Sequence, residues 1–310
     1  MADAETGPAD RPRVTLFAVG GTGESFAGDE RSEVAGLLRE VTTHLDERFT
    51  CRWVGYPASY GPAPRLVGMS YRDSLDIGTR ELRRRLQEVD GPIALIGYSQ
   101  GAVVIRDTIT ELSDAGDPLV DRVLAVGLVA DPHQPPGAVT GCAGWGVAGP
   151  GRPMPAGVPT YWVGAPDDMI CNATADSFVR DIADLTAALA FGGIGRWVSQ
   201  LWTVLRTNSF QNASRTSPGL EQVRRDLERV RTAMREIAGY LPGTLRWHSV
   251  ELRNPRGGRH TSYAREPYRR APVTDPDTTG CQALARWLQV QATFSPVGCA
   301  GSALDSELAA

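Results

Sequence analysis

Short continuous apolar runs alternate with segments of helical spacing along the first half of the chain. The runs are rich in Val, Ile and aromatic residues: VTLFAV (14–19), FTCRWV (49–54), IALIGY (93–98), VLAVGLVA (123–130) and TYWVGA (160–165). Such runs are typical of strands buried on both faces of a parallel sheet. Between them, apolar residues three and four apart predict helices over 34–45 and 75–89. Strand alternating with helix predicts a right-handed, parallel α/β sheet.

The pattern changes after Cys171. Residues 176–243 contain helical spacing and no convincing strand, and their clearest helix lies between Ser217-Pro218 and Pro242-Gly243. Beyond it, residues 245–252 predict a strand that returns to the sheet, and residues 280–291 predict a last helix. The helical block is therefore expected to interrupt the α/β domain.

This organisation predicts one α/β catalytic domain with a helical insertion. The domain is expected over 13–175 and 244–292, with the insertion at 176–243, a disordered arm at 1–12 and a C-terminal tail at 293–310. The apolar stripe of the insertion favours packing on neighbouring helices or on the sheet. A second interpretation stays open, in which aromatic residues make the insertion a lid or a lipid-facing wall: Phe191, Trp197 and Trp202.

Composition narrows the function classes. A net charge of −4 leaves no basic footprint for nucleic acid, so no nucleic-acid partner is expected. All 32 basic residues are Arg, which suggests a GC-rich bacterium or something that infects one. No apolar run approaches the ~18 residues of a membrane helix, and the charged N-terminus does not resemble a signal peptide. Five Cys without a CxxC pair argue against a zinc site, and no metal or other cofactor is expected.

The segment GYSQG (97–101) carries the most specific chemistry. It fits GxSxG, in which a strained turn between strand and helix exposes a nucleophilic serine between glycines that avoid collision. A buried run precedes it and a helical pattern follows it, as that motif requires. Ser99 is therefore the candidate nucleophile. The competing interpretation is a glycine turn that merely needs small residues.

A serine nucleophile needs a histidine base, and the chain offers four histidines. His44 lies in a helical pattern, His133 follows a strand-end Asp-Pro, and His248 lies in a predicted strand. His260 lies in a loop from which an imidazole can reach a cleft, so it is the candidate base, with His248 as the substitute.

Three carboxylates terminate predicted strands and are candidates for the residue that orients the base. They are Asp131, one strand after the nucleophile, and Asp167 and Asp168, two strands after it. Sheet hydrolases present their members in the order serine, acid, histidine, with the acid usually on the later loop. This favours Asp167 or Asp168, while a turn-capping role stays open for all three.

An oxyanion hole is expected from two backbone segments. One donor is the N–H of Gln100, which begins the helix after the nucleophile. The other is expected from Gly21 and Thr22 in the glycine-rich loop GGTGES (20–25), which lacks the spacing of a phosphate- or dinucleotide-binding loop. Tyr98, next to the nucleophile, is a candidate substrate-binding residue.

These motifs resemble those of known esterases. YSQGA (98–102), DMIC (168–171) and His260 are similar to the cutinase-type serine esterases, in which the acid opens a D-x-[VI]-C segment; the resemblance favours Asp168. WVGYPASYGP (53–62), DPHQPPG (131–137) and the helical block between acid and histidine resemble the lysin B proteins of phages that infect mycolic-acid-bearing actinobacteria. The resemblance implies a cutinase-like α/β-hydrolase fold.

The lysin B resemblance implies a serine esterase that cleaves the ester between mycolic acids and arabinogalactan during phage lysis. Its substrate would be this lipid-linked cell-wall polysaccharide, and the protein would wait in the host cytoplasm until lysis releases it to the envelope. Two alternatives stay open: a cutinase-like lipase or mycolyl-type acyltransferase with the same triad, and a non-catalytic wall-binding protein. The sequence also leaves Cys142 and Cys171 as a candidate disulfide across the acid loop.

Overall fold

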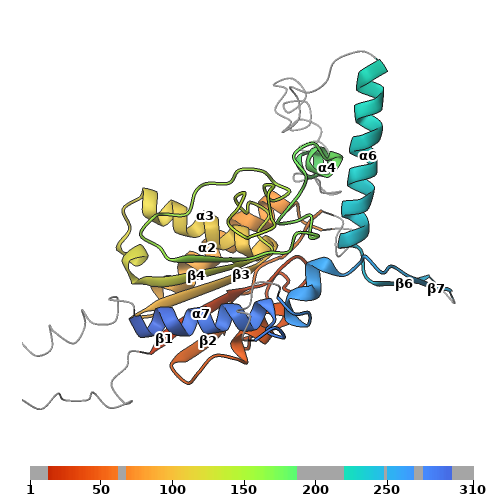
Figure 1. The fold of residues 1–310 in the computed structure, drawn as a ribbon. Helices are drawn as coiled ribbons and strands as arrows, with labels where there is room; N and C mark the ends of the chain where they lie inside the picture. The colour runs from red at the N-terminus through yellow and green to blue at the C-terminus, as the bar shows by residue number, and fades with distance from the viewer. Residues whose placement is uncertain (1–12, 62–67, 187–219, 248–249, 269–274, 295–310) are drawn as a thin grey trace, which may run out of the picture.

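The centre of the molecule is a five-stranded parallel sheet (Figure 1). The computed structural model describes residues 13–61, 68–186, 220–247, 250–268 and 275–294. The strand order is β2-β1-β3-β4-β5, which places β3 in the middle. The strands are β1 (Val14–Val19), β2 (Phe49–Trp53), β3 (Ile93–Tyr98), β4 (Val123–Val129) and β5 (Thr160–Val163). Each coincides, within two residues at its end, with one of the predicted apolar runs.

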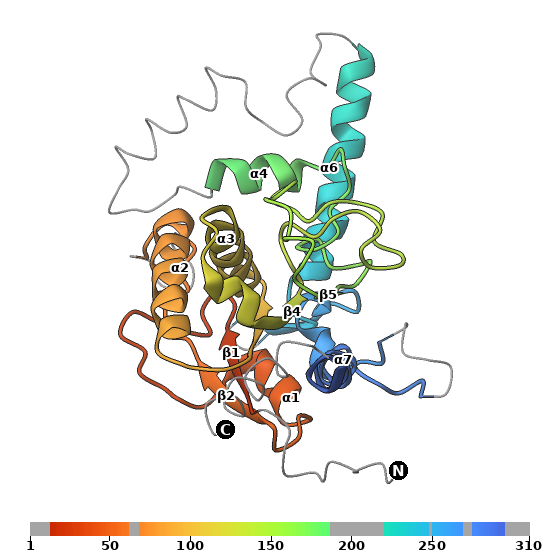
Figure 2. The same ribbon diagram turned by 90° about the vertical axis from the view of Figure 1, so that its left-hand side faces the viewer.

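Helices cover both faces of this sheet (Figure 2). Helices α2 (Tyr71–Gln87) and α3 (Gln100–Asp114) lie on one face. Helices α1 (Arg39–Thr42) and α7 (Gly280–Phe294) lie on the other. The expected α/β class, a central parallel sheet flanked by helices, is confirmed.

The continuous apolar runs reflect burial on both faces. On β1, Leu16 and Ala18 belong to the core beneath α1 and α7, whereas Phe17 and Val19 belong to the core beneath α2 and α3. Successive side chains of a strand point to opposite faces, so a strand covered on both sides needs apolar residues at every position. This double layer holds the carboxyl ends of the strands rigid.

The first helical region is shorter than predicted. The pattern over 34–45 predicts a helix, but the structure has a 3-10 turn, η2 (Gly36–Leu38), followed by the single turn of α1. Gly36 has φ +63°, which is incompatible with a helix that continues through it. A second 3-10 turn, η3 (Pro118–Arg122), leads into β4.

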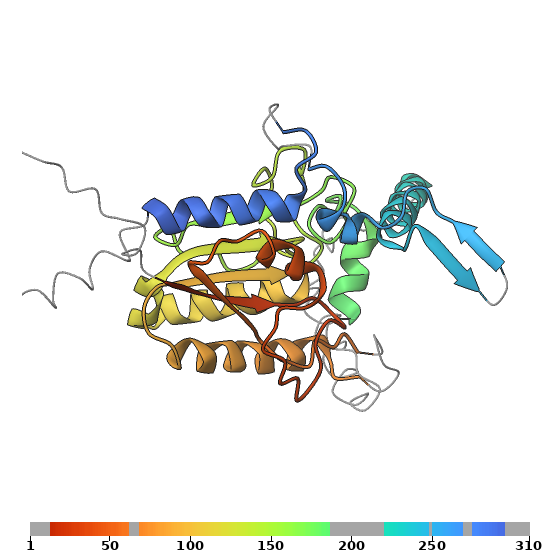
Figure 3. The same cartoon turned by 90° about the horizontal axis from the view of Figure 1, so that it is seen from below.

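The second half of the chain departs from one expectation. Helices α4 (Phe178–Thr186) and α6 (Leu220–Tyr240) form the described part of the insertion. The expected returning strand over 245–252 is wrong: β6 (Thr244–Trp247) and β7 (Val250–Arg253) pair antiparallel as a separate hairpin that projects from the body (Figure 3). The exposed Glu251 suits this hairpin and not a strand buried on both faces.

Some sequence predictions lie outside the described residues. These are the arm at 1–12, the aromatic residues Phe191, Trp197 and Trp202, the helix start at Ser217-Pro218, His248, and the tail from residue 295. Within the described ranges, the helices are too short or too polar to cross a bilayer.

A buried ion pair ties helix α3 to the loop after β4. Arg106 and Asp131 have side chains 2% and 0% exposed and form a salt bridge. The Asp131 carboxylate also accepts hydrogen bonds from the Trp162 indole at 3.0 Å and from the His133 backbone N–H at 2.9 Å. These contacts give the strand-end Asp131 a structural role in the loop.

Replacement of Asp131 by Asn should lower the free energy of unfolding by ~3–5 kcal/mol, because it leaves the Arg106 guanidinium buried without its counter-charge. Chemical denaturation followed by circular dichroism measures this. The matched control is Asp114→Asn, which breaks an exposed ion pair with Arg152 at the end of the same helix and should cost under ~1 kcal/mol. Equal losses in the two variants would contradict the structural role.

Candidate active site

Ser99 lies on a strained turn between β3 and α3. Its backbone has φ 52° and ψ −116°, in the region that side-chain-bearing residues rarely adopt. A Cβ on Gly97 would lie 2.7 Å from the backbone of Ala102, and a Cβ on Gly101 would lie 2.0 Å from the carbonyl oxygen of Val19. Both flanking glycines are therefore required by close backbone approach, and the elbow predicted from GxSxG is present.

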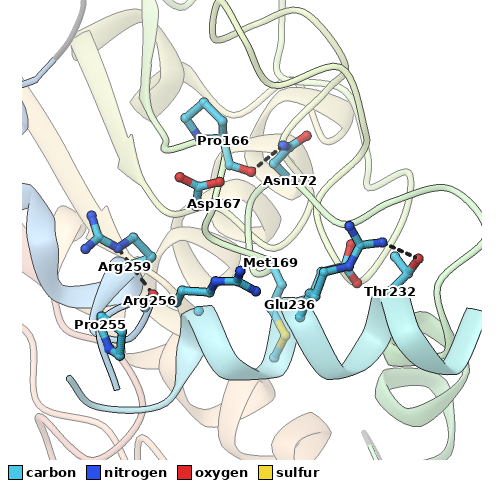
Figure 4. A pocket seen from close by; sticks show the side chains of 11 residues that line it. Pro166, Asp167, Met169, Asn172, Thr232, Glu236, Pro255, Arg256 and Arg259 are labelled. Carbon is cyan, nitrogen blue, oxygen red and sulfur yellow. Dashed lines mark hydrogen bonds between the residues drawn. The ribbon is translucent and has the colours of Figure 1, made fainter. Parts of the chain in front are cut away.

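The structure brings Ser99, His260 and Asp168 together in one line of hydrogen bonds. His260 Nε2 lies 3.0 Å from Ser99 Oγ, and His260 Nδ1 lies 2.9 Å from Asp168 Oδ2. A carboxylate only accepts hydrogen bonds, so Nδ1 carries the proton and Nε2 is left as the acceptor for the serine hydroxyl. All three side chains are at most about a tenth exposed. Asp167, by contrast, is exposed and lines a pocket on the side of α6 (Figure 4).

Hydrogen bonds and the neighbouring His260 keep the Asp168 side chain ionised despite its burial. Complete burial raises the pKa of this carboxyl, but the charge of His260 and hydrogen bonds from three groups outweigh it and lower the pKa below its ordinary value. Besides His260, the donors are the Tyr263 hydroxyl, 2.6 Å from Oδ2, and the Ile170 backbone N–H, 3.0 Å from Oδ1. Burial and the charge of Asp168 raise the pKa of Tyr263, so this hydroxyl keeps its proton and donates.

Two tyrosines enclose the His260 ring. Tyr98 stacks on it with ring centroids 4.9 Å apart and donates its hydroxyl to the His260 carbonyl oxygen at 2.9 Å. Tyr240, the last residue of α6, tilts against it at 5.2 Å. Tyr98 is buried, so in this structure its side chain supports the histidine, and the substrate-binding role expected for it stays a prediction.

The loop after β1 approaches the nucleophile closely. A Cβ on Gly21 would lie 2.8 Å from the buried Tyr98 ring and 3.3 Å from the Ser99 Cβ, so a side chain here would force its neighbours to shift. The Gly21 N–H, however, donates to Glu24 Oε2 at 2.8 Å, which corrects the expectation that it is an oxyanion donor in this conformation. Thr22 donates its hydroxyl to the Gln100 side chain at 3.0 Å, and so lies next to the residue that begins α3. The first N–H groups of a helix lack intrahelical acceptors, which leaves Gln100 suited to bind an oxyanion.

The other histidines and cysteines that the structure describes lie elsewhere or are buried. His133 Nδ1 lies 2.9 Å from the Gly149 carbonyl oxygen, and burial lowers the pKa of its ring, whereas His44 lies on the surface near α7. Cys142 and Cys171 are buried thiols, so the candidate disulfide is not formed in this structure. Among the described residues, His, Cys, Asp and Glu form no cluster of three that could hold a metal ion.

Sequence reasoning missed three residues around the triad. His260 lies in a 3-10 turn, η6 (Arg259–Ala264), and not in a flexible loop; the tyrosine three residues later, Tyr263, faces the same carboxylate. The i,i+3 spacing in HTSY was the available signal, once a helical turn was assumed. Glu24 and Tyr240 reach the site through tertiary contacts that no local pattern encodes.

The fold and this hydrogen-bonded constellation define a serine hydrolase of the α/β-hydrolase class. Within that class, residues 49–179 match the family model of the PE-PPE domain, a stretch that runs from β2 through the elbow and the acid loop into α4. No curated protein sequence matches the chain.

Solved structures of esterases share part of the architecture. A cutinase-like protein from Cryptococcus sp. is 20% identical with a TM-score of 0.42, over 53% of this chain and 81% of that chain. An acetyl xylan esterase is 18% identical with a TM-score of 0.37, over 63% and 98% of the two chains. Trichoderma reesei cutinase, solved with a phosphonate inhibitor, is 22% identical with a TM-score of 0.35, over 53% and 67%. At these sequence identities and TM-scores, the assignment of a serine hydrolase depends on the geometry of the site itself.

Replacement of Tyr263 by Phe should move the acid limb of the kcat/KM profile to higher pH by up to about one unit. The lost hydroxyl is one of the donors that lower the pKa of Asp168, and a hydrogen bond to a charged group contributes ~1.5 kcal/mol, equivalent to about one pKa unit. Without this donor, Asp168 holds its proton to higher pH, and His260 then lacks its ionised partner. Hydrolysis of a nitrophenyl ester, followed from about pH 4 to about pH 9, measures the shift of the acid limb.

The matched control is Tyr161→Phe, because Tyr161 lies within β5 and stacks on Trp287 of α7. It should leave the acid limb in place. If Tyr263→Phe lowers kcat/KM at every pH without moving the acid limb, then Tyr263 fills space and does not lower the pKa of Asp168.

Proposed function

We propose that this protein is a serine esterase whose catalytic residues are Ser99, His260 and Asp168. The observation that carries the proposal is the pair of hydrogen bonds through one imidazole, at 3.0 Å to the serine and 2.9 Å to the aspartate. An acceptor nitrogen at that distance can take the serine proton, which an isolated hydroxyl does not release at neutral pH.

Acylation begins when Ser99 Oγ attacks the ester carbonyl carbon while its proton passes to His260 Nε2. Asp168 holds the Nδ1 proton and stabilises the imidazolium, so the charge that develops is met by a fixed, ionised partner. The carbonyl oxygen becomes an oxyanion, for which the Gln100 N–H and the Thr22 segment are the proposed donors; one such donor typically contributes ~3 kcal/mol. Collapse expels the alcohol, which takes the proton from Nε2.

Deacylation repeats these steps with water. His260 Nε2 removes a proton from water, the resulting hydroxide attacks the acyl-serine carbon, and the second tetrahedral intermediate collapses to release a fatty acid and restore the Ser99 hydroxyl. This chain's residues supply the nucleophile, the base and the charge stabilisation that both steps need.

We infer further that the substrate is the ester between mycolic acids and arabinogalactan, cleaved in the cell envelope during phage lysis. Support comes from the lysin B resemblance in WVGYPASYGP, in DPHQPPG and in the helical block between acid and histidine. The insertion also reaches the site, since Tyr240 at the end of α6 contacts the His260 ring. The proposed substrate is therefore a lipid-linked polysaccharide.

Incubation with purified mycolyl-arabinogalactan should release free mycolic acids, detected by mass spectrometry of the lipid extract. Ser99→Ala should lower the rate by ~10⁵-fold or more, because the covalent step is lost while the fold is kept. Acyl chains found on a sugar acceptor instead would indicate a transferase, and release of short-chain esters alone would indicate a cutinase-like esterase. Release of mycolic acids by Ser99→Ala at the rate of the unmodified protein would contradict the assignment of Ser99 as the nucleophile.

Adjacent carboxylates supply a control for the acid. Asp168→Asn should lower kcat by ~10⁴-fold, because the amide favours the wrong imidazole tautomer. Asp167→Asn, whose side chain lies outside the hydrogen-bond line, should change kcat by less than about ten-fold. The reverse order of effects would assign the acid to Asp167.

A further inference from the structure

The carboxylate of Glu24 closes the glycine-rich loop that lies beside the nucleophile. Its Oε2 accepts the Gly21 N–H at 2.8 Å, and its Oε1 accepts the Leu37 N–H at 2.8 Å. The Glu24 backbone N–H in turn donates to the Gly21 carbonyl oxygen at 3.0 Å. Glu24 therefore holds both backbone polar groups of Gly21 and joins the loop after β1 to the 3-10 turn η2.

The space around this carboxylate is kept free by glycines. A Cβ on Gly36 would lie 2.3 Å from Glu24 Oε1, and a Cβ on Gly20 would lie 3.0 Å from Glu24 Oε2. A side chain at Gly36 would thus push the carboxylate away from the two N–H groups that it binds. Glu24 is half-buried, so these hydrogen bonds are partly shielded from water and are stronger than they would be on the surface.

The same loop contacts the elbow that carries Ser99. A Cβ on Gly101 would lie 2.6 Å from the Gly20 carbonyl oxygen, so the loop and the elbow approach each other through their backbones. The Thr22 hydroxyl donates to the Gln100 side chain at 3.0 Å. Thr22 therefore lies next to the residue whose N–H is the first proposed oxyanion donor.

The bonds of Glu24 to Gly21 set the direction of the next amide. The Gly21 carbonyl and the Thr22 N–H belong to one planar, trans peptide group, in which the C=O and N–H bonds point in opposite directions. Because the Glu24 N–H binds the Gly21 carbonyl, the Thr22 N–H is turned away from the Glu24 backbone. Gly20, Gly21 and Gly23 give this loop unusual backbone freedom, so a fixed direction for the Thr22 N–H needs a restraint.

We propose that Glu24 is a positioning residue of the oxyanion hole. By binding the N–H and the carbonyl of Gly21, it holds the Thr22 segment next to Ser99, so that a donor from this segment meets the oxyanion as it forms. Donors of this kind stabilise the transition state most when they are already in place and need no rearrangement. The inference rests on the proposed function, because it concerns the ester hydrolysis that begins at Ser99, and it adds the group that orients the second donor.

Glu24→Gln tests this role with a side chain of nearly the same shape. The amide has one acceptor oxygen in place of two and turns its NH2 group toward one of the two N–H donors, so the loop loses a restraint. On a soluble nitrophenyl ester, kcat should fall by about ten-fold or more while KM changes by less than about three-fold, because the oxyanion is absent from the bound substrate.

The matched control is Asp117→Asn. The Asp117 carboxylate also accepts a backbone N–H, that of Leu119 at 3.1 Å, but it lies before β4, at the edge of the parallel sheet opposite the triad. This variant removes the same kind of bond from a distant loop, so it should leave both kcat and KM unchanged.

A thionoester substrate separates positioning from a general loss of stability. Its sulfur accepts hydrogen bonds weakly, so the thionoester gains little from an oxyanion hole. The ratio of kcat/KM on the oxygen ester to kcat/KM on the thionoester should fall by about five-fold or more in Glu24→Gln and stay constant in Asp117→Asn. An unchanged kcat or an unchanged ratio in folded Glu24→Gln would overturn the inference.

Circular dichroism establishes that each variant is folded. If Glu24→Gln does not fold, Glu24→Asp takes its place with the same expected and contrary results, because its shorter side chain cannot reach both N–H groups at once. Ester hydrolysis by Ser99→Ala at the full rate would refute the proposed esterase itself. Loss of hydrolysis in Ser99→Ala together with full activity in Glu24→Gln would keep the esterase and refute the role of Glu24.

Discussion

The hydrogen bond between His260 Nδ1 and Asp168 Oδ2 is the interaction on which the site depends. It joins residues 92 positions apart in the sequence, across the whole helical insertion. Because Asp168 is fully buried, its charge is tolerated only while His260, Tyr263 and the Ile170 N–H all donate to it. The same bond fixes the imidazole tautomer and so leaves Nε2 facing Ser99. Loss of this bond would leave both a buried charge and an undirected base.

The α/β fold brings the three residues of the triad together. Ser99 is fixed by the elbow between β3 and α3, where Gly97 and Gly101 allow backbone contact that a side chain would prevent. Asp168 follows β5 at the same edge of the sheet, and His260 is held by η6, with Tyr98 stacked on its ring. A parallel sheet presents all its carboxyl ends at one edge, so residues from three distant segments meet there.

The insertion contributes to the same edge. Tyr240 contacts the His260 ring, and Gly239 lets α6 approach the acid loop, so the helix that interrupts the domain in sequence completes the surroundings of the triad in space. The described C-terminal end of α6 therefore packs against residues that surround the triad.

Local sequence patterns predict the strands and the elbow, whereas much of the rest of the site depends on tertiary contacts. The five apolar runs and GYSQG were sufficient for the sheet and for Ser99, because burial on both faces and glycine at a tight turn each leave a local signature. The hairpin at 244–253 was mistaken for a sheet strand, since alternation alone does not name a partner. The contact of Tyr263 with Asp168 and the commitment of the Gly21 N–H to Glu24 depend on geometry that spacing does not encode.

The most direct test of the central claim is a crystal structure of the protein reacted with an alkyl phosphonate ester. The proposed triad predicts a covalent bond from phosphorus to Ser99 Oγ, the phosphoryl oxygen bound by the Gln100 N–H, and His260 still bridging the serine and Asp168. Phosphonylation of a different residue, or an unmodified Ser99 with His260 turned away from it, would contradict the account.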